Sequence, residues 1–180
     1  MFILASGSPR RKELLHKLID DFVILVPEID EHAFPLAAKD LPAALSKAKA
    51  YEIYKDHQKD EILACDTIVV LNDEVLGKPK SPQNAIEMLR FESGKRQIVL
   101  SGYTYIGKGK EITRTVSTSV YFANLSEEQI REYVEKYQPF DKAGAYGIQD
   151  GYPLIDHIEG SFDNVMGLPT EDIAHHVFGR

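Results

Sequence analysis

Four positions along the chain place a cationic side chain beside a turn or near the end of a predicted element. Arg10 and Arg11 follow a Ser-Gly-Ser turn, Lys78 lies between a glycine and a proline, and Lys49 lies within a predicted helix. Such a set suits a polyphosphate, because exposed helix-end amides, bidentate arginines and point-charge lysines can converge on its oxygens. Each cation taken alone is more simply a solvated surface charge. Their combination indicates a phosphate-binding site.

Two carboxylates could complement this positive charge. Asp66 interrupts the apolar run 63–71, where an unpaired carboxylate is costly to bury. A buried salt bridge or a capping contact accounts for Asp66 as well as a functional site does. Glu31 stands in the acidic segment 28–32 and is most simply a surface residue. Proteins usually hold Mg²⁺ with one or two carboxylates, waters and substrate phosphates, so this acid pair fits metal-assisted phosphate chemistry.

Other kinds of site are disfavoured. The six histidines show no zinc-binding spacing, and Cys65, the single cysteine, is typical of a small core residue. The dipeptide Gly77-Lys78 lacks both the glycine-rich loop and the following Ser or Thr of a Walker P-loop. The tyrosines of segment 96–123 alternate as strand core does, and an aromatic platform for single-stranded nucleic acid is improbable at this net charge.

Hydrophobic periodicity and turn signals predict the elements that position these residues. The predicted strands cover 2–5, 22–26, 62–76 with a hairpin turn at Asn72-Asp73, and 96–123 with a turn at 107–110. The predicted helices run from Ser8-Pro9, from Pro42 to about 57, from Ser81-Pro82 to about 93, from Ser126 to about 137, and from about 169. Segment 141–149 is predicted to form a strand or two with glycine kinks.

Two of these helices have distinctive features. The first is predicted to begin with Ser8 as its N-cap, and its first turn carries both arginines. The helix macrodipole disfavours cations at that end, so we expect an anionic group to compensate them. Its apolar face is predicted to contain Leu14, Leu15, Leu18 and Ile19, and the inward candidates of the helix from Pro42 are Ala43, Ala44, Ala48 and Tyr51.

Length and composition predict one domain over residues 1–180 with a mixed α/β sheet. The 28 acidic and 21 basic residues give a net charge of −7, which opposes non-specific binding to nucleic acid or anionic lipid. A single cysteine fits a reducing compartment, and the first residues do not match a secretory signal. We therefore expect a cytoplasmic protein with no nucleic-acid or membrane partner.

An ordered set of segments spanning nearly the whole chain resembles the Maf family of nucleoside triphosphate pyrophosphatases. The most diagnostic are Ser-Pro-Arg-Arg and Asp-Lys-Ala-Gly-Ala-Tyr-Gly-Ile-Gln. Two positions differ from the usual pattern, because Gln97 stands where the family has histidine and Gln138 where it has an acidic residue. The matching segments are 4–15, 29–31, 49–50, 66–69, 77–79, 141–149 and 164–169.

The resemblance implies hydrolysis of a nucleoside triphosphate between its α and β phosphorus atoms, with Mg²⁺ or Mn²⁺ as cofactor. Asp66 would accept a proton and, with Glu31, hold the metal. Phosphates would be bound by Arg11 and by Lys49 and Lys78, which join Asp66 in the catalytic set. Substrate binding and choice would depend on Ser8, Arg10, Thr67 and Gln149.

The resemblance also implies an elongated mixed α/β fold with a central cleft, related to the inosine triphosphatases, and a homodimer. The Ala-Tyr-Gly-Ile-Gln sequence is similar to the branch acting on dTTP and UTP, with modified pyrimidine nucleotides as further candidate substrates. One alternative is a pyrophosphatase for 7-methyl-GTP or other non-standard nucleotides. Another is a nucleotide-binding regulator of septum formation and cell division with little turnover.

Overall fold

A single seven-stranded mixed sheet runs through the protein, whose computed structural model describes all residues from Met1 to Arg180. The strand order is β2-β1-β3-β5-β6-β7, and β4 pairs with β3 outside this path. β1 is parallel to both β2 and β3, whereas every other pairing is antiparallel. The strands are β1 (Phe2–Ala5), β2 (Val23–Leu25), β3 (Glu61–Leu71), β4 (Glu74–Leu76), β5 (Arg96–Gly107), β6 (Lys110–Phe122) and β7 (Ile155–Glu159).

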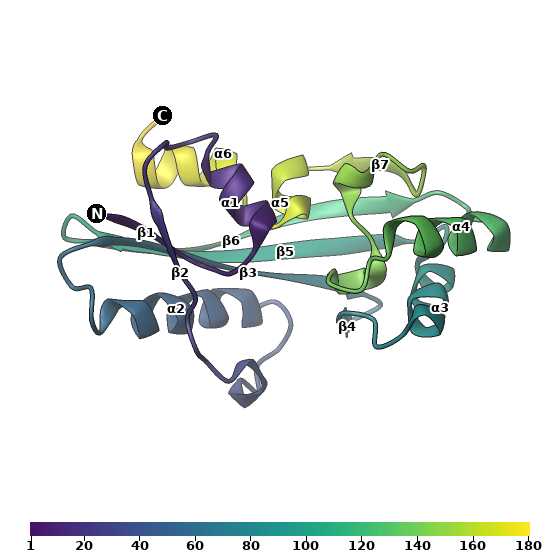
Figure 1. The fold of residues 1–180 in the computed structure, drawn as a ribbon, viewed down its shortest axis with the longest axis horizontal. Helices are drawn as coiled ribbons and strands as arrows, with labels where there is room; N and C mark the ends of the chain where they lie inside the picture. Colours follow the sequence, from purple (N-terminus) through teal and green to yellow (C-terminus); the bar gives the residue numbers. More distant parts are fainter.

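Helices cover the sheet in two groups at opposite ends of the long β5 and β6 strands (Figure 1). At one end α2 lies on one face and α1 and α6 lie on the other, while α3 and α4 lie at the far end. None of the helices combines the length and apolar character that a membrane span requires. The helices are α1 (Pro9–Leu15), α2 (Leu41–Tyr54), α3 (Pro82–Glu92), α4 (Glu127–Tyr137), α5 (Phe162–Met166) and α6 (Thr170–Ile173).

Shorter helical turns complete the chain. Three are 3₁₀ turns, and a π-helical turn follows α6 directly. They are η1 (Glu31–Ala33), η2 (Ala143–Ala145), η3 (Ile148–Asp150) and η4 (Ala174–Phe178). The mixed α/β class predicted from the sequence is confirmed.

Local sequence signals explain where most elements begin and turn. The Ser8 hydroxyl accepts a hydrogen bond from the Arg11 amide, as predicted for the N-cap of α1. Ser126 forms the predicted capping box at the start of α4. At the β3–β4 hairpin Asn72 and Asp73 have φ of 51° and 62°, the left-handed pair that a tight hairpin turn requires.

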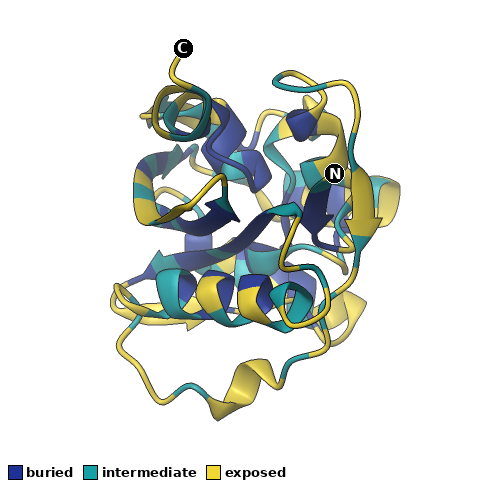
Figure 2. Ribbon diagram, turned by 90° about the vertical axis from the view of Figure 1, so that its left-hand side faces the viewer, coloured by how far each residue is buried: buried dark blue, intermediate teal, exposed yellow.

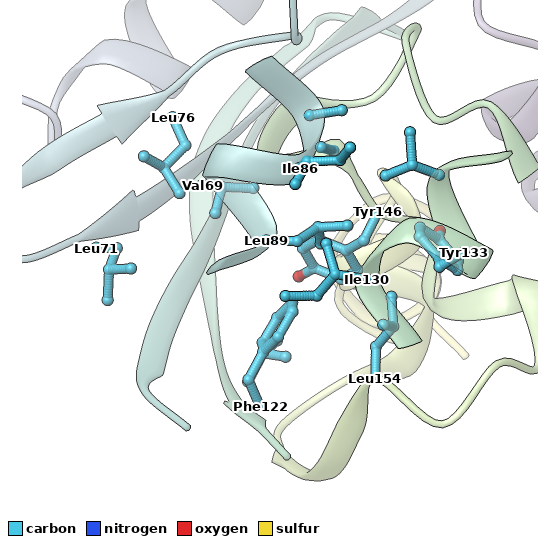
Figure 3. Packing of buried hydrophobic residues seen from close by; sticks show 14 of the residues in the cluster. Val69, Leu71, Leu76, Ile86, Leu89, Phe122, Ile130, Tyr133, Tyr146 and Leu154 are labelled. Carbon is cyan, nitrogen blue, oxygen red and sulfur yellow. The ribbon is translucent and has the colours of Figure 1, made fainter. Parts of the chain in front are cut away.

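The hydrophobic core divides along the sheet in the same way as the helices. The far-end cluster packs α3 and α4 on the sheet and includes Leu89, Ile130 and Tyr146 (Figure 3). A second cluster packs α1 and α6 against the face opposite α2, with Leu14 and Tyr103 among its members. Viewed along the sheet, buried residues fill the middle layer while α2 turns an exposed side outward (Figure 2). A third and smaller cluster packs α2 against β1 and β3 and includes Ala50 and Ile62. The polar residues described below lie between the first two clusters.

The segment 141–149 was wrongly predicted as strand. It forms the turns η2 and η3 instead, because Gly144 and Ala145 have φ of 73° and 58° and so interrupt any extended backbone. The first helix is also shorter than expected, since α1 ends at Leu15. Leu18 and Ile19 lie beyond it but still pack against the second cluster.

The buried face of α2 also differs from the expectation. Tyr51 was an inward candidate but is 39% exposed, and its hydroxyl donates a hydrogen bond to Glu111 at the edge of the sheet. The helix approaches β5 so closely at Gly102 that a Cβ there would lie 2.2 Å from the Pro42 carbonyl carbon. This contact turns a different set of residues toward the sheet: Pro42, Leu45, Ser46, Lys49 and Ala50.

Candidate active site

All the site residues predicted from the sequence line one cavity of about 240 Å³ between the two halves of the core. An adjoining cavity of about 330 Å³ shares most of its cationic and acidic residues and extends along the backbone of 5–9. The two form one continuous cleft, which we call the central cleft. Its predicted site residues are Ser8, Arg10, Arg11, Glu31, Lys49, Asp66, Thr67, Lys78 and Gln149.

A buried ion pair lies at the bottom of the central cleft. The Lys49 Nζ on α2 is 2.8 Å from Asp66 Oδ1 on β3 and 2.7 Å from Glu31 Oε1 in η1. The second carboxylate oxygen of Asp66, Oδ2, is buried and has no hydrogen-bond partner. A buried carboxylate oxygen without a partner is costly, and it is available to accept a proton or bind a cation.

The backbone around Asp66 explains why Lys49 can reach it. Asp66 lies directly across from Gly102 of β5, the position where α2 comes closest to the sheet. A side chain at Gly102 would push the helix away, so the glycine allows the ion pair to form. Gly102 was not predicted as part of the site, although a glycine inside a largely apolar strand is the signal that could have indicated it.

Arg11 is held by a backbone carbonyl on the opposite side of the cleft. Its Nε donates to the Gly167 carbonyl oxygen over 2.8 Å, and its Nη2 donates to Thr67 Oγ1 over 3.2 Å. The same carbonyl oxygen accepts from Thr67 Oγ1 and from Cys65 Sγ, each over 3.3 Å. Gly167 has a φ of 122°, a conformation open to glycine, so the 164–169 segment contributes a backbone acceptor to the site.

A weaker contact bridges the mouth of the cleft. Arg10 Nη1 lies 3.4 Å from Asp141 Oδ2, and the other oxygen of Asp141 is 3.1 Å from Lys142 Nζ. Partial burial acts to raise the pKa of the Asp141 carboxyl, but Lys142 and Arg10 outweigh it and hold the pKa below its usual value. Asp141 and Lys142 were not assigned as site residues from the sequence, although both lie in a segment that it singled out.

Glu31 is held in its charged form by the surrounding cations. Its partial burial acts to raise the pKa of the carboxyl, whereas the hydrogen bond and charge of Lys49, with Lys78 and Arg11, lower it. The net effect is a pKa below 4.5. Glu31, which the sequence alone indicated as a surface residue, is therefore part of the site.

The remaining wall of the cleft is the segment 143–150, which carries Gln149. The Gly144 amide donates to the Gly77 carbonyl oxygen over 3.1 Å, which joins this wall to the residue preceding Lys78. The Gly147 amide donates to the Tyr133 hydroxyl over 2.9 Å. These contacts hold the wall in place, and Gln149 lines the same cavity as the cations.

The carboxylates of Glu31 and Asp66 could bind a divalent metal ion together with the phosphate oxygens of a ligand. No cluster of three or more His, Cys, Asp or Glu side chains forms a complete protein site. Glu31 and the unpartnered Oδ2 of Asp66 instead provide the one or two carboxylates with which Mg²⁺ is held alongside phosphate oxygens and waters.

Comparison with known proteins gives the family. A family model described as Maf-like protein matches residues 1–178. The chain belongs to the Maf family. The resemblance drawn from the sequence motifs is thereby confirmed.

Among curated relatives of this Maf family member, the dTTP/UTP pyrophosphatase of Bacteroides thetaiotaomicron is 46% identical over 177 residues, covering 95% of this chain and 91% of the relative. The dTTP/UTP pyrophosphatase of Thermosipho africanus is 45% identical over 179 residues, covering 99% and 92%. The Ham1 protein of Staphylococcus aureus has a similar fold, with a TM-score of 0.51 over 85% of this chain and 90% of that chain. Its sequence is 15% identical, so this likeness concerns the fold alone.

Proposed function

We propose that this protein hydrolyses dTTP and UTP to the monophosphate and pyrophosphate. One observation carries the proposal: the cations and carboxylates that such a reaction needs, which are scattered over the sequence, line one cleft. The names of the Bacteroides and Thermosipho relatives support the same substrates.

The cationic end of the cleft suits the triphosphate. Displacement at phosphorus needs little covalent help from the protein, and most of the rate enhancement comes from positioning and charge stabilisation. Arg11 is already fixed by the Gly167 carbonyl, so its remaining donors are oriented before a ligand binds. Lys49 and Lys78 add point charges for the pyrophosphate leaving group.

Asp66 is suited to accept a proton from the attacking water. Lys49 fixes one carboxylate oxygen, and the other has no partner inside the protein. A base held in this way is oriented by one oxygen and reacts through the other. Mg²⁺ or Mn²⁺, when bound by Glu31 and Asp66 with the substrate phosphates, would supply further charge neutralisation and activation of water.

The opposite end of the cleft suits a pyrimidine base. The Gln149 amide offers both a donor and an acceptor, which match the alternating groups on a uracil or thymine edge. Thr67 acts differently, because its hydroxyl already contacts Ser101 Oγ at 2.8 Å in addition to Arg11 and the Gly167 carbonyl. We infer that Thr67 influences substrate choice by holding Arg11 rather than by contacting the base.

A pyrophosphate-release assay tests the proposal and its alternatives. The substrates are dTTP, UTP, CTP, 7-methyl-GTP and ITP, each with and without Mg²⁺ or Mn²⁺. Release from dTTP and UTP that depends on the metal is the expected result. Binding without release would favour a nucleotide-binding regulator of septum formation, and preferential release from 7-methyl-GTP or ITP would favour the other substrate classes.

The homodimer and the cytoplasmic location remain predictions. Sedimentation velocity of the purified chain tests the first, and fractionation of the producing cells tests the second. A monomer at micromolar concentration would contradict the predicted dimer without affecting the proposed reaction.

A further inference from the structure

The last residue of α3, Glu92, is a fully buried carboxyl with no cationic partner. Its Oε1 accepts one hydrogen bond, from Gln97 Nε2 over 3.0 Å. Its Oε2 is buried and has no partner at all. A carboxyl in such a place costs more than the leucine that would fill the same part of the core, so its presence needs an explanation.

Glu92 is connected to the base end of the cleft through two residues. Gln97 on β5 is also buried, and its Oε1 accepts a hydrogen bond from the Tyr146 hydroxyl over 2.7 Å. Tyr146 lines the central cleft and packs edge-on against Phe122, with the ring centres 5.0 Å apart. It lies among the labelled core residues of α3 and α4 in Figure 3. Glu92, Gln97 and Tyr146 therefore form a continuous chain from the core to the cleft.

A second contact joins Glu92 to the same wall. A Cβ on Gly144 would lie 2.7 Å from Glu92 Oε1, and Gly144 has a left-handed φ of 73°. The carboxyl oxygen thus occupies the space that a side chain at position 144 would need. The middle residue of η2, Gly144, and the residue that follows η2, Tyr146, therefore both lie against the Glu92–Gln97 pair.

The surroundings of Glu92 favour a carboxyl that takes part in hydrogen bonds over one that carries a charge. Burial raises the pKa of its carboxyl well above 4.5, with only the Gln97 hydrogen bond acting against this. No cation faces it from α3, β5 or η2, and the titratable group packed against it is Tyr146, whose own pKa is raised first by burial and then by Glu92. Burial therefore shifts Glu92 toward its neutral form relative to an exposed glutamate, and the neutral acid resembles the amide of glutamine in shape and polarity.

We propose that Glu92 and Gln97 are positioning residues for nucleobase recognition, acting through Tyr146 on the wall that carries Gln149. This inference rests on the proposed function and deepens it. It also gives a role to Gln97, one of the two positions where the chain differs from the usual family pattern. The hydrogen bonds of Glu92 and Gln97 lead to Tyr146 on the wall that carries Gln149 and do not reach Arg11, Lys49 or Asp66, so we expect binding of the base to depend on them more than binding of the phosphates.

The test compares three ligands that contain different parts of the substrate. They are dTTP, CTP, and inorganic tripolyphosphate, which has no base and is measured as a competitive inhibitor. Glu92→Leu should raise KM for dTTP about tenfold, the loss expected for one buried hydrogen bond, and should lower the preference for dTTP over CTP. The kcat for dTTP and the inhibition constant of tripolyphosphate should stay within about twofold.

Two further variants control for a merely structural effect. Glu92→Gln keeps the acceptor and the shape, so it should restore the wild-type KM and preference. If Glu92→Leu does not fold, as judged by circular dichroism, Tyr146→Phe removes only the hydroxyl that contacts Gln97 and should show the same division between KM and tripolyphosphate inhibition. Unchanged preference in a folded variant, or equal changes for dTTP and tripolyphosphate, would overturn the inference.

Binding measurements separate this inference from the proposed reaction. Titration calorimetry with dTMP and CMP needs no turnover, and Glu92→Leu should weaken dTMP about tenfold while leaving tripolyphosphate binding unchanged. Absence of pyrophosphate release by the wild-type protein would overturn the reaction but not the positioning role. Release by the wild-type protein with the same dTMP affinity in both proteins would overturn the positioning role alone.

Discussion

Of the three carboxyls that the protein buries, Asp66 and Glu92 lie in different parts of the core, and their partners differ. Asp66 lines the central cleft beside Lys49, and its second carboxylate oxygen is buried without a hydrogen-bond partner. Glu92 lies behind the cleft and has a neutral amide as its single hydrogen-bond partner. The first carboxyl has a cationic partner at the cleft, whereas burial without a cationic partner raises the pKa of the second. The partner of a buried carboxyl, more than its burial, therefore indicates its use.

The largest expected effect is the loss of activity on replacing Asp66, the carboxyl at the cleft. Asp66→Asn keeps the shape of the side chain but removes the proton acceptor, so pyrophosphate release from dTTP should fall about 10³-fold or more. The fold should remain, which circular dichroism and thermal melting can check. Near-wild-type turnover in the folded variant would remove Asp66 from the catalytic role.

The next effect concerns Lys49, the cation that forms an ion pair with Asp66. Lys49→Met leaves a buried carboxylate without its partner and should cost about 3 kcal/mol of unfolding free energy. Denaturant unfolding measures this cost. In the double variant with Asp66→Asn much of the loss should be recovered, because no uncompensated charge remains. Additive losses would contradict the direct ion pair.

A smaller effect is expected at the base end of the cleft. Gln149→Ala should change the preference between dTTP and CTP by about tenfold, because the amide that matches the base edge is lost. The maximal rate with dTTP should change much less than in Asp66→Asn. The full substrate profile is the measurement, and an identical profile in the variant would refute this role for Gln149.

The smallest effect is a pH-dependent gain in stability at Glu92. The folded pKa of this carboxyl is raised above 4.5, so the wild type loses stability as pH rises from about 4.5 toward the folded pKa. Glu92→Gln cannot ionise and should be spared this loss. Its Tm should exceed that of the wild type at pH 7, where part of the wild-type stability has been lost. The two proteins should converge near pH 4, and a constant offset between them would contradict a raised pKa.

Local signals in the sequence predicted the parts of the fold that depend on neighbouring residues. Ser8 and Ser126 begin helices, and Asn72-Asp73 turns a hairpin, because capping and left-handed turns involve only a few adjacent residues. The 141–149 segment was not predicted correctly. Its conformation depends on partners far along the chain, including the Gly77 carbonyl and the Tyr133 hydroxyl.

The nine site residues named from chemistry and family resemblance all line the cleft. The Asp141 and Lys142 side chains, the Gly167 carbonyl and the close approach at Gly102 were not predicted. Glu92 did have a signal, because it continues the apolar face of Ala85 and Leu89 along α3. A charged residue on the buried face of a helix is therefore worth testing as a functional candidate.

The missing side chain at Gly102 has a mechanical consequence. The backbone of α2 at Pro42 lies against the backbone of β5 at Gly102, so α2 cannot move closer to the sheet. This helix is therefore the rigid wall of the cleft. The wall formed by 141–149 meets α1 at the mouth of the cleft through the exposed 3.4 Å contact between Arg10 and Asp141, which is cheap to break and remake. We therefore expect any tightening of the cleft around a nucleotide to come from movement of the 141–149 wall rather than of α2.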